Sequence, residues 1–422
     1  MEFECESLQL VSRFAGEKEQ KDIFSNDDIA IEILSRLPTE STRELKCVSK
    51  RWCVLFSCPS FINANFQRFR GTISGLFVQG TFRCTDDCCG NFLDYEGIDY
   101  ISIDKEQTNA VFKKCLDFLP ERVVITGSSN GILLCRSFFE VNYPDHRFDR
   151  RRGNTKEHQK KIMLYVCNPL TKEWAVIQPR GKYQSGCCYG FSYDPFLSSF
   201  EVVMVQRPWL EKDPYLFKVY SSQTGKWRIS KEACTLSAKD QINLHQSCFT
   251  DGVFYWLTTK HNILAFDLKQ ERSQINKLPG HVLFMEGREG LCLGISQGKL
   301  HYVCFNMDEL VIWGFEDNKW VLKHLKPQCD MHCPLLGAHW KRRLHDFSSS
   351  HKVPNAAMHP YALRGDILFM KVLGCMCTYN IKTEEFEDKF CVFSQLESAD
   401  SKIPIMLPYC KSLLSVKLTK IR

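Results

Sequence analysis

The chain has 422 residues, of which 44% are apolar and 25% charged, an ordinary globular composition that excludes a largely disordered chain. The formal net charge of +6 is mild for this length, so charge gives no reason to expect a nucleic-acid or membrane partner. No run of about 18 apolar residues occurs, so we expect no membrane-spanning helix.

The sequence contains 22 cysteines, which in a secreted protein would predict a disulfide framework. The first residues include several acids and no apolar stretch of signal-peptide length, so we do not expect secretion. We expect reduced thiols that pack as small apolar side chains, in a protein of the cytoplasm, the nucleus or both. Several lie within apolar runs, namely Cys135, Cys167, Cys248, Cys304 and Cys391.

Residues 22–67 predict about three short helices. Asp27 or Asn26 can cap the first, and apolar residues then recur at four-residue spacing on one face until Pro38 ends the run. Ser41 or Thr39 can cap the second helix. A third apolar stretch contains Trp52, Leu55 and Phe56, and Pro59 is expected to end it.

These helices carry more apolar residues than a core of this size can hide. The surplus consists of Ile29, Ile33, Leu37, Val48 and Trp52. Two interpretations follow: a face that binds another protein, or an ordinary helical cap on a larger domain.

The strings DDIAIEILSRLP, KCVSKRW and CPSF, in this order, closely resemble the plant form of the F-box. The family usually opens with Leu-Pro, whereas this chain has Phe24-Ser25-Asn26, which weakens one expected adaptor contact. The resemblance implies binding to a Skp-family adaptor and, through it, to a cullin–RING ubiquitin ligase. It assigns adaptor contacts to Ile29, Ile33, Leu34, Leu37, Pro38, Leu45, Val48 and Trp52.

After residue 67 the pattern changes to short β-branched and aromatic runs separated by Gly, Asn and Asp. Residues 71–78 and 98–103 predict strands, and residues 111–119 predict either a short helix or a loop. We therefore expect a multidomain protein: a flexible N-terminus at 1–21, the helical module at 22–67 and an all-β domain at 68–422.

A rough internal repeat runs through the all-β region. A glycine turn followed by an apolar strand recurs at 128–137, 250–259, 296–305 and 363–372. A strand–turn–strand unit recurs at 164–177, 217–230, 310–323 and 377–390, and 263–279 fits the same position without its aromatic residue. Serial antiparallel sheets of this kind favour a β-propeller of five or six blades, closed by a strand at 413–418. A β-sandwich or an irregular β-solenoid is the alternative.

The segments SSNGILLCRS, YVCNPLTKEW, YGFSYDP and VYSSQTGKWR resemble, in order, the plant F-box-associated domain of the kelch-like kind. The resemblance covers residues 120–390 and implies that this region holds the target of ubiquitylation. The double glycine of true kelch blades is absent.

Two irregular loops are candidates for contact with a target. The segment 142–161 contains Arg150, Arg151 and Arg152, and residues 206–214 contain Trp209. A solvated insertion is the competing interpretation of the basic segment. The tryptophans Trp174, Trp227 and Trp320 share one repeat position, which favours packing between blades over binding.

Neither the cysteine group around Cys84, Cys88 and Cys89 nor the cysteines and histidines of 329–345 has the paired spacing of a zinc site, so we expect no metal and no cofactor. Recognised catalytic motifs are also absent from the sequence. The sequence predicts a non-catalytic substrate receptor of a Skp–cullin–F-box ligase. An F-box scaffold or inhibitor without ligase output, and a propeller enzyme with a helical cap, are the alternatives.

Overall fold

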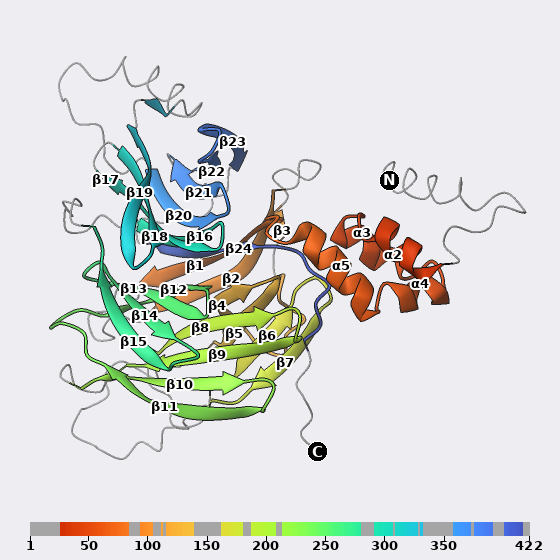
Figure 1. The fold of residues 1–422 in the computed structure, drawn as a ribbon, viewed down its shortest axis with the longest axis horizontal. Helices are drawn as coiled ribbons and strands as arrows, with labels where there is room; N and C mark the ends of the chain where they lie inside the picture. Colours follow the sequence, from red (N-terminus) through yellow and green to blue (C-terminus); the bar gives the residue numbers. More distant parts are fainter. Residues whose placement is uncertain are drawn as a thin grey trace, which may run out of the picture. The chain divides into compact units, whose positions relative to one another are not determined.

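The computed structural model describes residues 26–83, 93–103, 111–112, 115–138, 162–179, 187–207, 213–279, 291–306, 309–327, 330–331, 358–372, 375–390 and 401–416. The chain divides into two compact units, Met1–Arg70 and Gly71–Arg422. Figure 1 shows helices in the first unit and strands in the second.

The described part of the first unit contains four helices: α2 (Asp27–Leu34), α3 (Thr39–Leu45), α4 (Lys50–Leu55) and α5 (Pro59–Phe69). Asn26 caps α2, because its side chain accepts from the backbone N–H of Asp28 at 2.9 Å. Ser49 caps α4 in the same way, accepting from Trp52 at 3.1 Å. We refer to residues 26–70 as the helical unit.

The sequence-based prediction for Pro59 is wrong. Pro59 opens α5 instead of ending the helical unit. Proline fits the first position of a helix, because the N–H that it lacks would have no partner within the helix. The new helix buries Phe61, which packs edge-on against Phe56 with ring centroids 4.8 Å apart. The helical unit therefore has a small core of its own.

The described strands of the second unit form five sheets. The first holds β24 (Ser401–Tyr409), β1 (Gly75–Arg83), β2 (Leu93–Ser102) and β3 (Val111–Phe112). The second holds β4 (Val123–Ser129), β5 (Ile132–Ser137), β6 (Leu164–Asn168) and β7 (Glu173–Ile177). The third holds β8 (Cys188–Asp194), β9 (Ser199–Gln206), β10 (Tyr215–Ser221) and β11 (Lys226–Cys234). The fourth holds β12 (Ile242–Thr250), β13 (Val253–Thr258), β14 (Asn262–Asp267) and β15 (Arg272–Lys277).

The fifth sheet has eight strands and is two four-stranded units joined edge to edge. One half holds β16 (Leu291–Ser296), β17 (Lys299–Asn306), β18 (Glu309–Glu316) and β19 (Lys319–Pro327). The other holds β20 (Met358–Arg364), β21 (Ile367–Val372), β22 (Cys375–Asn380) and β23 (Glu385–Phe390). The halves meet only where β16 pairs in parallel with β20 over two residues, whereas all other described pairs are antiparallel.

Serial four-stranded antiparallel units confirm the expected β-propeller. The repeat halves found in the sequence coincide with strand pairs: β6–β7, β10–β11, β14–β15, β18–β19 and β22–β23 are the strand–turn–strand units. The glycine turns also form as expected. Asp251 and Gly252, between β12 and β13, both have positive φ, as a two-residue hairpin turn of the primed type requires.

The propeller is closed by a different strand from the one predicted. β24 pairs antiparallel with β1, so Tyr409 lies opposite Gly75 and the last strand completes the first sheet. The predicted strand at 413–418 does not form over its described residues, although Leu413 and Leu414 are buried. Residues 111–119, expected to be a helix or loop, contain the two-residue strand β3 and a turn.

Neighbouring sheets are held together by buried apolar side chains. Between the third and fourth sheets, the Phe217 and Phe266 rings stack 4.4 Å apart and Trp256 is 1% exposed. The cysteines Cys135, Cys167 and Cys304 are buried and free, as expected, whereas Cys248 is half-buried. Cys391 lies outside the described residues.

The three repeat-position tryptophans lie at the outer strands and are not equivalent. The Nε1 of Trp227 donates to the carbonyl oxygen of Gln178 in the preceding sheet, and that of Trp320 to Lys277, each at 3.0 Å. These two therefore link neighbouring sheets, in line with the expected packing. Trp174 is 42% exposed and packs only at its edge against Tyr165.

Candidate functional site

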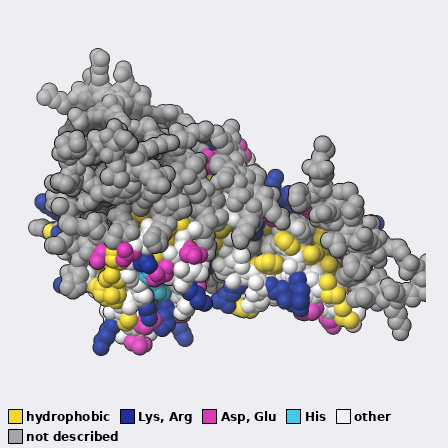
Figure 2. Space-filling view, turned by 90° about the horizontal axis from the view of Figure 1, so that it is seen from above, with side chains coloured by type: hydrophobic (Ala, Val, Ile, Leu, Met, Phe, Trp, Pro, Cys, Tyr) yellow, Lys and Arg dark blue, Asp and Glu magenta, His cyan; other side chains and the backbone are white. Residues whose placement is uncertain are grey.

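The helical unit exposes apolar side chains that its core does not use. Ile29 and Ile33 on α2 are 45% and 43% exposed, Val48 after α3 is 49% exposed and Val54 on α4 is 71% exposed. Figure 2 shows hydrophobic side chains at the surface among charged ones. We call Ile29, Ile33, Val48 and Val54 the apolar surface.

The predicted adaptor contacts differ in their burial. Pro38 is exposed, while Leu37, Leu45 and Trp52 are half-buried. Leu34 is 5% exposed and lies on the inner side of α2. Its four-residue register with Ala30, which is also buried, explains this position. Leu34 supports α2 from within, and its role as an adaptor contact stays a prediction.

Val54 was not identified from the sequence. Residues 52–56 form one apolar run, in which spacing alone does not say which side chains point outward. The structure turns Leu55 and Phe56 inward, where Phe56 contacts Trp52 at 5.5 Å between ring centroids. Val54 is left on the outside because the core is already filled.

The turn between α2 and α3 places Leu37 and Pro38. Within it, the backbone N–H groups of Arg36 and Leu37 donate to carbonyl oxygens of α2 at 3.2 and 3.1 Å. From α5, the Nδ2 group of Asn65 donates to the carbonyl oxygens of Ser35 at 3.2 Å and Leu37 at 3.3 Å. The sequence-based reading did not single out Asn65, because it assigned no helix after Pro59.

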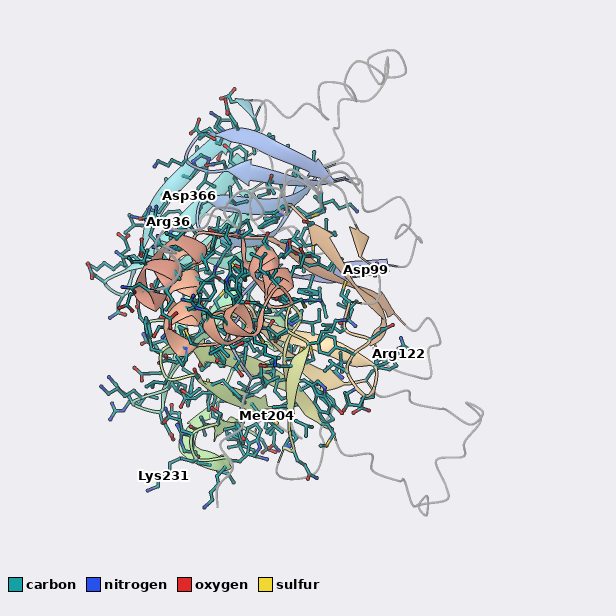
Figure 3. The ribbon with its side chains drawn as sticks, turned by 90° about the vertical axis from the view of Figure 1, so that its right-hand side faces the viewer. Arg36, Asp99, Arg122, Met204, Lys231 and Asp366 are labelled. Carbon is teal, nitrogen blue, oxygen red and sulfur yellow. The ribbon has the colours of Figure 1, made fainter. Side chains whose placement is uncertain are left out.

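A charged cluster lies on the last turn of α2. Glu32 Oε1 accepts from Arg36 Nη2 at 2.7 Å and from Arg68 Nη2 at 2.6 Å (Figure 3 labels Arg36). The two arginines hold the pKa of Glu32 below its ordinary value, because their hydrogen bonds and charges favour the carboxylate. The cluster is exposed, so its main effect is to fix the ends of α2 and α5 rather than to stabilise the fold.

The predicted target contacts Arg150, Arg151, Arg152 and Trp209 lie outside the described residues. So do the cysteine group at 84–89 and the cysteines and histidines of 329 and 332–345. Within the part of the chain that the structure describes, no group of three or more His, Cys, Asp or Glu could hold a metal ion. None of the described helices combines the length and the apolar character needed to cross a membrane.

A family model for the β-propeller of F-box proteins, described as "F-box protein At3g26010-like, beta-propeller", matches residues 99–414, which is more than half of the chain. The chain belongs to this family of F-box proteins. The matched residues start within β2 and end after β24, so the match covers the propeller and not the helical unit.

Named relatives agree with the family assignment. The F-box protein At5g07610 of Arabidopsis thaliana is 26% identical over 327 residues, covering 71% of this chain and 69% of the relative. The F-box protein At5g49610 of the same plant is 25% identical over 288 residues, covering 64% and 68%. The β-propeller domain of Cps50 (Swd1) from Myceliophteria thermophila aligns with a TM-score of 0.36 at 10% identity over 74% of this chain and 87% of that domain. At this TM-score the likeness adds nothing to the assignment.

Proposed function

We propose that this F-box protein is the substrate receptor of a Skp–cullin–F-box ubiquitin ligase. The helical unit binds a Skp-family adaptor, and the propeller captures a target protein. The observation that carries the proposal is the apolar surface, because Ile29, Ile33, Val48 and Val54 stay exposed although the helical unit already has a buried core. Exposed apolar residues gathered on one small unit are typical of a protein-binding face.

The proposed chemistry belongs to the ubiquitin-conjugating enzyme, and this chain supplies proximity. A target held on the propeller presents its lysines at a high effective concentration near the charged ubiquitin. We therefore propose a non-catalytic role without a cofactor, in the cytoplasm, the nucleus or both. The contacts predicted for Arg150, Arg151, Arg152 and Trp209 remain part of this proposal.

The test is adaptor binding by the full-length chain with Ile29→Gln and Ile33→Gln combined. Each substitution replaces a side chain whose burial is worth about 1.5–3 kcal/mol, so the dissociation constant is expected to rise at least about tenfold. Isothermal titration calorimetry with a purified Skp-family adaptor measures this. The combination of Leu37→Ala with Pro38→Ala is expected to weaken binding in the same direction.

The matched control is Ile229→Gln in β11 of the propeller, where the isoleucine is 70% exposed. It changes the same chemistry on the other unit and is expected to leave adaptor affinity unchanged. If wild-type protein with both units folded does not bind the adaptor, the proposed function is wrong. Equal affinities for wild type and the double variant would instead contradict the assigned surface.

A further inference from the structure

One side chain from α5 contacts both ends of the turn between α2 and α3. The two Nδ2 hydrogen bonds of Asn65 reach Ser35 at the end of α2 and Leu37 within the turn. Its Oδ1 accepts from Thr39 Oγ1, in the first residue of α3, at 3.2 Å. The amide of Asn65 thus has partners on both of its polar atoms, and these partners fix its orientation.

The turn needs an outside donor because of its own sequence. Pro38 has no N–H, and it precedes α3 without providing a side-chain cap. The N–H groups of Arg36 and Leu37 point back into α2, so they cannot pair with the carbonyl oxygens of Ser35 and Leu37. Asn65 is 1% exposed and Ser35 is fully buried, which places these hydrogen bonds away from water. Without the amide, buried acceptors would be left unpaired.

A second residue on the same helix supports the end of α2. Arg68 lies about one turn after Asn65, and its Nε donates to Ser35 Oγ at 2.9 Å. Its Nη2 pairs with Glu32 at 2.6 Å. The last turn of α2, which carries Ile33, is therefore held by α5 at two successive positions.

We propose that Asn65 is a positioning residue for adaptor binding. It fixes Leu37 and Pro38 relative to Ile29 and Ile33, so that residues from α2 and from the turn form one continuous face. Asn65 does not contact the adaptor, because its side chain is enclosed by the helical unit. The inference rests on the proposed function and adds α5, which supplies no predicted contact, to the parts that the adaptor site requires.

Preorganisation explains why the effect reaches binding affinity. A turn that samples several conformations must be ordered when the adaptor binds, and the cost of ordering reduces the affinity. A turn already held by Asn65 avoids that cost. Loss of the amide is therefore expected to weaken binding even when the helical unit is fully folded.

The test compares Asn65→Asp with wild type in the full-length chain. The carboxylate keeps the size of the side chain and its acceptor for Thr39, but places an oxygen against two carbonyl oxygens in place of a donor. The adaptor dissociation constant is measured at about 10 °C, where circular dichroism verifies that each variant is folded, and is expected to rise at least about tenfold. Amide hydrogen exchange at residues 35–39 is expected to accelerate without global unfolding.

Low temperature separates positioning from stability. When more than about 99% of the molecules are folded, a further loss of stability cannot lower the measured affinity noticeably, so a merely structural role predicts no change. The matched control is Asn63→Asp, two residues earlier on α5 and half-buried, which introduces the same charge away from the turn. Its affinity is expected to equal that of wild type.

Thr39→Val provides a milder variant should Asn65→Asp not fold. It removes only the hydroxyl that orients the Asn65 amide, and is expected to weaken binding by a smaller factor, whereas Thr39→Ser keeps the hydroxyl and restores affinity. Wild-type affinity in folded Asn65→Asp, or in Thr39→Val if the first variant does not fold, overturns the inference alone. An equal loss in Asn63→Asp also overturns it. Absence of binding by wild type overturns the proposed function and with it this inference.

Discussion

The helical unit and the propeller use their apolar residues differently. The helical unit completes its core with a few side chains, such as Phe56 and Phe61, and leaves Ile29 and Ile33 nearly half exposed. The propeller places its largest side chains, including Trp256, between neighbouring sheets. A small unit cannot bury every apolar residue that it carries, so the surplus is available to a partner. A ring of sheets needs many of its apolar residues to hold the sheets together.

Truncation of a tryptophan between sheets gives the largest expected effect and tests this contrast within the propeller. Trp256→Ala removes a side chain that is 1% exposed and is expected to cost about 3–5 kcal/mol of unfolding free energy. Trp174→Ala removes one that is 42% exposed, and is expected to cost about 1 kcal/mol through its contact with Tyr165. Denaturant unfolding of the propeller measures both. Similar losses would contradict the division between sheet-joining and surface tryptophans.

A smaller effect is expected from the cap of α2, which sharpens the comparison from the side of the helical unit. Asn26→Ala removes the acceptor of the Asp28 N–H and is expected to cost about 1 kcal/mol. Asn26→Asp keeps a capping oxygen and serves as the control. Scanning calorimetry of the full chain should show a lower unfolding temperature for the helical unit alone. A matching shift of the propeller transition would show that the two units unfold together.

The smallest expected effect is a pH dependence confined to the propeller. Burial lowers the pKa of His261, His301 and His324 below the ordinary value of 6.5, whereas residues 22–70 contain no histidine. As pH falls below 6.5, the unfolded chain therefore binds protons before the folded propeller does. Propeller stability is then full above this pH and decreases as the pH falls toward the folded-state pKa values.

Calorimetry of the full chain between about pH 7.5 and pH 5.5 isolates this effect, because ordinary carboxyl groups titrate lower. The propeller transition is expected to move to lower temperature while that of the helical unit stays in place. His301→Gln is expected to reduce the slope. An unchanged slope in that variant, or equal movement of both transitions, would assign the pH dependence to other groups.

The helices could be predicted as far as capping residues and apolar spacing define them. Asn26 and the four-residue spacing located α2, but Pro59 has two opposite meanings in a sequence. It can end one helix or begin the next, and only the burial of Phe61 behind it decides. Because α5 was missed, so was Asn65, whose partners are 26 to 30 residues away in sequence.

In the propeller, the glycine turns and strand pairs made the repeat visible, and the closing strand did not follow it. β24 contains Pro404 and Pro408, which argue against a strand in a sequence-based reading. The described pairing of β24 is with β1 alone, at one edge, and an edge strand tolerates residues that lack an N–H. The segment 413–418 resembles a strand better, but its described residues pack without joining a sheet.

The pairing of β24 with β1 has a consequence during protein synthesis. β1 ends at Arg83 and β24 begins at Ser401, so at about 5–20 residues per second the ribosome needs on the order of tens of seconds to supply the missing neighbour. During that interval the nascent chain already contains the whole helical unit, while one edge of β1 has no strand beside it. A messenger truncated before the codon for Ser401 would thus yield a chain that still carries the apolar surface but cannot close the ring.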